Sequence, residues 1–202
     1  MALRIETFSG SALSPMLPAL SRLRMAVFRA WPYLYEGDPA AEEDYLADFV
    51  RAPSAGLVVA FDGGDPVGCS TCVALAEEDA GLTGPFATIG VDPSRVFYFG
   101  ESVLLPAYRG QGVGVAFFAA REAHARAVSD CDYAAFCAVV RPDDHPVRPP
   151  GHVPLDAFWR RRGFTPYPGL MCHMMWREVG MADEIDHTLS FWIKSLHGKP
   201  LP

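Results

Sequence analysis

The sequence VLLPAYRGQGVG, residues 103–114, contains the strongest signal for the fold. An apolar run comes first, and three glycines follow on alternate positions, at Gly110, Gly112 and Gly114. Residues 112–129 then have a helical pattern, so the stretch predicts a strand, a glycine-rich loop and a helix. The first N–H groups of a helix lack intrahelical partners and carry the positive end of its dipole. Because glycines let an anion approach these groups, the loop predicts a phosphate or pyrophosphate site.

Two common phosphate-binding motifs do not fit this loop. A Walker A loop requires G-x-x-x-x-G-K-[ST], and no lysine follows these glycines. A dinucleotide fingerprint requires G-x-G-x-x-G, but its last position is Val115 when counted from Gly110 and Phe117 when counted from Gly112. The remaining pattern is an arginine and two glycines, R-x-x-G-x-G, between a strand and a helix.

This pattern resembles the acyl-CoA-binding signature [RQ]-x-x-G-x-[GA] of the GCN5-related N-acetyltransferase (GNAT) superfamily, with Arg109, Gly112 and Gly114 at the motif positions. The preceding LLPAYRG (104–110) is similar to the family's V-x-P-x-Y-R-G lead-in. Further along, FWRRRGF (158–164) resembles its second signature, Y-x-x-x-G-F. The order of the expected helices and strands is also similar over nearly the whole chain.

The resemblance implies both a fold and an activity. The fold is α+β: one GNAT domain over residues 1–202, with a mixed, mostly antiparallel central sheet, helices on both faces and splayed central strands. The activity is acyl-CoA-dependent N-acyl transfer, with acetyl-CoA as the donor and a primary amine of a small molecule or peptide attacking it directly in a ternary complex. The alternative is a non-catalytic acyl-CoA-binding or regulatory module. No metal is implied.

The resemblance also implies where acetyl-CoA binds. The pyrophosphate is expected on the backbone N–H groups of Gln111 to Gly114, and the pantetheine arm in the cleft between the splayed strands. Phe158 is expected in the cleft wall. Arg160 to Arg162 are either a solvated helix face or include one contact to a CoA phosphate. The implied cofactor-binding residues are Val103, Leu104, Leu105, Arg109, Gly110, Gln111, Gly112, Val113, Gly114 and Phe158.

Amine acylation requires a base for the amine and a proton for the leaving thiolate. Glu101 is the only carboxylate on the strand before the glycine loop, and it is the candidate base; otherwise it binds substrate or is structural. Trp159 occupies the position of the family's frequent general-acid tyrosine, and an indole N–H is not an acid at neutral pH. Either the thiolate leaves unaided or another group protonates it, and the unranked candidates are Tyr98, Ser102, Tyr108, Tyr167, Cys172, and His145 and His152 in the proline-rich loop 141–154.

The charge distribution bears on the acceptor. The net charge is −7, which argues against nucleic acid as a partner. Residues 1–100 contain 13 acidic and 6 basic side chains, whereas residues 101–202 contain 11 of each. In the family the N-terminal helices line the acceptor groove, and here YEGDPAAEEDYLADF (35–49) mixes carboxylates with aromatic rings. The stretch favours a cationic amine, or it is an ordinary solvated acidic face.

The rest of the sequence predicts a compact α/β protein. Five cysteines, an odd number, indicate reduced thiols, and Cys69 and Cys72 are expected on opposite faces of one strand rather than in a metal or redox pair.

The N-terminus does not read as a signal peptide and no apolar run approaches a membrane span, so we expect a cytoplasmic protein without a membrane partner. The apolar segment 189–196 either pairs across a homodimer or closes its own sheet. Strands are expected at 3–9, 56–61, 66–76, 95–105, 133–140, 170–178 and 187–196, helices at 14–31 (capped by Ser14), 39–52 and 155–163, and a loop with a short helix at 77–95.

Overall fold

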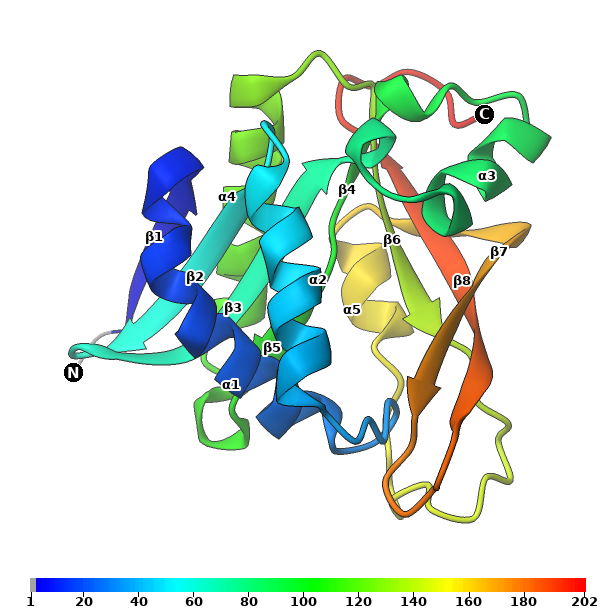
Figure 1. The fold of residues 1–202 in the computed structure, drawn as a ribbon. Helices are drawn as coiled ribbons and strands as arrows, with labels where there is room; N and C mark the ends of the chain where they lie inside the picture. Colours follow the sequence, from blue (N-terminus) through cyan, green and yellow to red (C-terminus); the bar gives the residue numbers. More distant parts are fainter. Residues whose placement is uncertain (1–2) are drawn as a thin grey trace.

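The computed structural model describes residues 3–202, which form a twisted mixed sheet with helices on both faces (Figure 1). The strands follow the order β1-β2-β3-β4-β6-β8-β7, and β5 also pairs with β3. Among the strand pairs of residues 3–202 only β4–β6 is parallel, so the expected mixed, mostly antiparallel sheet is confirmed. The strand bounds are β1 Arg4–Ser9, β2 Gly56–Asp62, β3 Asp65–Ala74, β4 Val96–Tyr98, β5 Ser102–Leu104, β6 Tyr133–Val139, β7 Thr165–Arg177 and β8 Glu184–Ser195.

Within residues 3–202, five α-helices cover the two faces of this sheet. One face carries α1 (Leu17–Phe28), α2 (Pro39–Arg51) and α3 (Ala80–Thr88), and the other carries α4 (Val113–Val128) and α5 (Asp156–Arg161). In β2 and β3 nearly all side chains are buried, so both faces of the sheet are covered there. Cys69 packs beneath α1 and α2 while Cys72 packs toward α4, which confirms that the two thiols point to opposite faces.

The N-terminal helix begins later than the sequence predicts. Residues Ser14–Met16 form a 3-10 turn, and α1 starts at Leu17 without any side-chain cap, so the prediction of Ser14 as its cap was wrong. Pro18 occupies the first turn of α1, where its missing N–H costs no hydrogen bond. By contrast α2 lies where expected, and Asp38 caps it by accepting the N–H groups of Ala40 and Ala41.

The strand predicted over 95–105 is interrupted by a bulge. Gly100 donates its N–H to the carbonyl of Thr71 at 3.1 Å, and Thr71 donates its own N–H to the carbonyl of Glu101 at 3.1 Å. A Cβ atom at position 100 would lie 2.5 Å from the Thr71 hydroxyl, so only glycine fits there. The single predicted strand is therefore two strands, β4 and β5, and the irregular backbone between them carries Glu101.

The central strands separate at this bulge. β4 pairs with β6 over three residues, and the last link is the Phe99 N–H donating to the carbonyl of Ala135 at 2.7 Å. Beyond it β6 continues along β8, whereas β5 stays with β3. Within residues 3–202 no strand pairs with the second edge of β5. The sheet thus opens as a V, and the expected splay is confirmed.

The C-terminal strand belongs to the chain's own sheet. β8 lies between β6 and β7 and pairs with both (Figure 1). Segment 189–196 is thus used within the molecule, and a homodimer remains a prediction. Within residues 3–202, no helix has the length and apolar character needed to cross a lipid bilayer.

Candidate active site

The glycine loop has the backbone geometry of an anion site. Gly110 has φ +78° and Gly112 has φ +83°, a left-handed conformation that only glycine adopts without strain. Gly112 is also the N-cap of α4, and no side chain accepts the first N–H groups of this helix. Arg109 donates its Nε–H to the Leu104 carbonyl at 3.3 Å, and the Gln111 amide donates to the Ala107 carbonyl, so both side chains fold back onto the loop.

The third glycine has a different physical role. A Cβ atom at Gly114 would lie 3.2 Å from the ring of Phe158, so the missing side chain lets α5 approach the start of α4. The Arg162 guanidinium lies 5.1 Å from the centre of the Phe158 ring, and its Nη1 atom is buried without a hydrogen-bond partner. Arg160 instead packs over Trp192. Of the three consecutive arginines, Arg162 is the one with an unsatisfied donor beside the glycine loop.

The cofactor-binding residues predicted in β5 contribute their main chain rather than their side chains to the cleft. Val103 is fully buried in the core beneath α1 and α2, and Leu104 packs against Gly68. One edge of β5 is hydrogen-bonded to β3, and Leu105 donates its N–H to the Val67 carbonyl at 3.0 Å. The open second edge borders the V between β5 and β6.

Glu101 lies in a buried charge network that its position in the sequence did not reveal. Its Oε2 atom forms an ion pair with the Arg24 guanidinium at 2.9 Å and accepts a hydrogen bond from the Tyr45 hydroxyl at 3.0 Å. Arg24 also binds the buried Glu42 carboxylate at 2.7 Å. The other carboxylate oxygen of Glu101, Oε1, is buried and has no partner. Arg24 lies on the apolar face of α1, next to Leu20, Leu23 and Val27. This charged residue among apolar ones was the one sequence signal for the network.

The network also changes the pKa values of its members. Burial opposes the charge on Arg24, but the Glu101 and Glu42 carboxylates and Tyr45 outweigh it and hold the pKa of Arg24 well above its usual value. Burial, reinforced by the negative charge of Glu101, raises the pKa of Tyr45 well above its usual value. Tyr45 is therefore a hydrogen-bond donor to Glu101 at neutral pH, not a phenolate.

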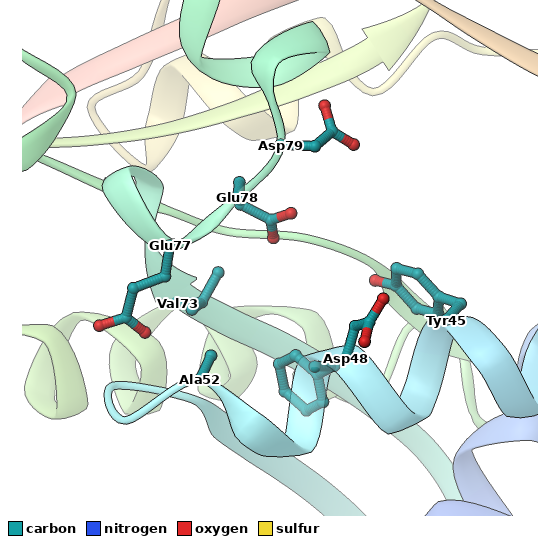
Figure 2. A pocket seen from close by; sticks show the side chains of 8 residues that line it. Tyr45, Asp48, Ala52, Val73, Glu77, Glu78 and Asp79 are labelled. Atoms are coloured by element: carbon teal, nitrogen blue, oxygen red, sulfur yellow. The ribbon is translucent and has the colours of Figure 1, made fainter.

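An acidic cavity of about 370 Å³ adjoins this network (Figure 2). Figure 2 shows Tyr45 and Asp48 of α2 on one side and Glu77, Glu78 and Asp79 on the other. Burial raises the pKa of Glu78 from 4.5 to about 7, and the charges of Glu101, Asp79 and Glu77 add to this effect. Phe49, Ala52 and Val73 complete the lining.

Only one side of this cavity was foreseen from the sequence. Tyr45 and Asp48 belong to the acidic stretch 35–49, but residues 77–79 fell in the segment 77–95, which was predicted as a loop with a short helix and was given no site residue. Two of these three carboxylates also have structural contacts. Glu77 accepts a hydrogen bond from the Ser54 hydroxyl at 2.8 Å, and Asp79 caps α3. Three consecutive carboxylates after an apolar strand were the available signal.

Trp159, at the position of the family's frequent tyrosine, packs among aromatic rings. The Trp159 ring lies 5.1 Å from Phe136 and 5.0 Å from Trp192. Among the other acid candidates, the Tyr98 hydroxyl is bonded to the Cys137 thiol at 3.0 Å, and burial raises the pKa of Tyr98 well above its usual value. A raised pKa makes the phenol a weaker acid.

The remaining acid candidates differ in their contacts and in their exposure. Tyr108 donates to Asp62 at 3.0 Å, and this bond raises the pKa of Tyr108. The rings of His145 and His152 lie 5.0 and 5.8 Å from the ring of Trp31, in the turn after α1. Ser102 is exposed, Tyr167 is half-buried and Cys172 is buried among apolar side chains.

Comparisons with known proteins agree with this arrangement. The family model described as "Acetyltransferase (GNAT) family" matches residues 21–164. No curated protein sequence matches the chain. Among solved structures, Arabidopsis thaliana NAA60 in complex with acetyl-CoA has a TM-score of 0.62 at 12% identity, over 98% of this chain and 100% of that one. Salmonella typhimurium yncA with its cofactor acetyl-CoA has a TM-score of 0.58 at 14% identity, over 100% and 98%. Escherichia coli ElaA has a TM-score of 0.57 at 16% identity, over 96% and 99%.

Proposed function

The chain belongs to the acetyltransferase (GNAT) family, and on this premise we propose that it transfers the acetyl group of acetyl-CoA to a primary amine by direct attack in a ternary complex. The observation that carries the proposal is that the N-terminus of α4 lies next to the open edge of β5. The uncapped N-terminus of α4 can accept a pyrophosphate, and the open edge of β5 next to it can pair with an extended amide-containing chain. CoA has both groups in this order.

The cofactor would lie along the glycine loop and β5. The N–H groups of Gln111 to Gly114 would bind the pyrophosphate, and the main chain of residues 103–105 would pair with the pantetheine arm. Phe158 would form the cleft wall, and the unsatisfied Nη1 of Arg162 would donate to a phosphate oxygen. The acetyl-CoA complexes of NAA60 and yncA, which share the fold, support this placement.

Glu101 would be the proton acceptor for the amine. Its Oε1 atom is unpartnered, while Arg24 and Tyr45 hold Oε2 and so fix the orientation of the carboxylate. After the ammonium has given its proton to Oε1, the nitrogen lone pair attacks the thioester carbon. The C–N bond forms, the nitrogen gives its second proton to water, the C–S bond breaks and CoA leaves as its thiolate.

The acidic cavity beside Tyr45 supports a cationic acceptor. Asp48, Glu77, Glu78 and Asp79 line a space on the α1–α2 face of the sheet, opposite α4. An amine that carries a second positive charge would place it among these carboxylates while its reacting nitrogen reaches Glu101. We therefore propose a diamine, a polyamine or a basic peptide terminus rather than a neutral or anionic amine.

The test is CoA release from acetyl-CoA over a panel of cationic, neutral and anionic amines. The wild-type protein should favour the cationic members, and Glu101→Gln should lower kcat by about 10²-fold or more. Glu6→Gln, an exposed carboxylate change on β1, is the matched control and should leave kcat unchanged. Preference for anionic acceptors would refute the cationic pocket. Tight binding of acetyl-CoA without acetylation of any amine would favour the non-catalytic module instead.

A further inference from the structure

Arg121 of α4 is a cation that the core holds without a counter-charge. Only 2% of the residue is exposed, and its Nε atom has no hydrogen-bond partner. Within residues 3–202, none of the ion pairs includes Arg121. Its guanidinium carbon lies 4.5 Å from the ring centre of Phe99 and 4.7 Å from that of Phe118. Two aromatic faces are thus its close partners.

Such a side chain is costly for folding. Burying a cation without a paired carboxylate costs more free energy than cation–π contacts with two rings offset. Burial lowers the pKa of Arg121 to about 10, although Cys72, Glu101, Glu122 and Tyr98 act in the opposite direction. The guanidinium is therefore still charged at neutral pH. A methionine or leucine would pack among the same rings without the penalty, so stability does not account for the charge.

The place of Arg121 in the fold suggests what the charge is for. Phe99, which the guanidinium covers, makes the last link between β4 and β6, so Arg121 lies where the central strands separate. Side chains of a helix lean toward its N-terminus, which directs Arg121 along α4 toward the glycine loop. Its second aromatic partner, Phe118, contacts Phe158, the ring that covers Gly114. The cation is thus at the inner end of the path that leads from the glycine loop into the V.

We propose that Arg121 stabilises the thiolate of CoA as it leaves, in the place of a general acid. The inference rests on the proposed function, which brings the thioester to the inner end of this cleft. When the C–S bond breaks, the electron pair goes to sulfur, and Trp159 has no acidic proton to give it. Arg121 keeps its own proton throughout and offsets the new negative charge. The thiolate then takes its proton from water as CoA leaves.

The test measures the pKa of the CoA thiol in the bound state, from the ultraviolet absorbance of its thiolate. A free thiol titrates near 8.5, and a nearby cation lowers that value. In the wild-type complex the thiol pKa should be at least about one unit lower than in the Arg121→Met complex, which corresponds to about a tenfold preference for thiolate. The kcat of Arg121→Met should be about tenfold lower than that of the wild type, while the KM for acetyl-CoA changes little.

Two further variants separate charge from packing. Arg121→Lys keeps a cation and should restore part of the lowered thiol pKa. Arg126→Met removes a partly exposed arginine from the same helix and should change neither quantity. A folded Arg121→Met protein that binds CoA with the wild-type thiol pKa and retains the wild-type kcat would overturn the inference while leaving the proposed function intact.

The wild-type protein alone supplies a second test, which holds even if Arg121→Met does not fold. CoA should gain affinity relative to desulfo-CoA, which lacks the sulfur, as the pH rises to about 9 and the free thiol ionises. Equal affinities of both ligands over this range would overturn the inference. Failure of the wild-type protein to bind CoA or acetyl-CoA at all would overturn the proposed function as well.

Discussion

Glu78 should make the stability of this protein depend on pH in an unusual direction. In the unfolded chain its carboxyl ionises near 4.5, but burial and the neighbouring carboxylates raise its pKa to about 7 in the folded state. Between these values the folded chain binds the proton more tightly than the unfolded chain. The free energy of unfolding should therefore fall as the pH rises through this window. Most carboxylates in proteins do the opposite, since they are stabilised as anions.

The size of the effect follows from the two pKa values. Each unit between them corresponds to about 1.4 kcal/mol, so full ionisation of Glu78 costs the fold about 3 kcal/mol at most. Because Glu78 keeps partial contact with water, we expect roughly half of that, about 1.5–2 kcal/mol. Glu78→Gln, which mimics the protonated form, should be as stable as the wild type near pH 4.5 and more stable by this amount near pH 8. For a chain of this size the gain is about 3–8 °C in Tm.

Urea denaturation of both proteins at the two pH values measures this difference. Asp48→Asn is the matched control, because Asp48 lines the same cavity but its side chain is 82% exposed. The control should show little dependence on pH. A Glu78→Gln protein with the same stability difference from wild type at both pH values would refute the argument. A pH-dependent difference requires that the pKa of Glu78 is higher in the folded state than in the unfolded chain. A cationic ligand in the cavity should reduce the difference by favouring the ionised Glu78.

Other substitutions test the loop, the charge network and a helix start. Gly112→Ala should cost about 1–2 kcal/mol and raise the KM for acetyl-CoA because φ is +83°, whereas Gly64→Ala, in open space, should be neutral; equal effects would contradict this. Arg24→Met leaves two buried carboxylates unpaired and should cost about 3–5 kcal/mol in urea denaturation; a loss under about 1 kcal/mol would refute the network. Asp38→Ala removes the cap of α2 and should lower thermal stability by about 1 kcal/mol, and an unchanged Tm would count against it.

The parts of the site that depend on local backbone chemistry could be predicted from the sequence. Glycines at 110 and 112 are needed because these residues have positive φ, and the helix that follows leaves its first N–H groups free. These are properties of a few consecutive residues. The pattern of apolar residues likewise predicted the order of strands and helices, although 95–105 is broken, α1 starts late, and β7 and β8 start earlier than predicted, at Thr165 and Glu184. The break depends on Thr71 of the neighbouring strand, which the local pattern of 95–105 does not contain.

The charges around Glu101 were decided by tertiary packing. Arg24 and Tyr45 meet Glu101 across 77 and 56 positions of the chain, and no local pattern encodes such a contact. Glu78 gains its raised pKa from burial between elements, and Arg121 meets Phe99, which is 22 positions away, only because α4 packs on the sheet. The sequence by itself determined that the protein has a strand, an anion-binding loop and a helix in the order of the family. Only the folded chain determined which carboxylates and cations lie close to one another, because electrostatic interactions depend on distance and burial in space and not on separation along the chain.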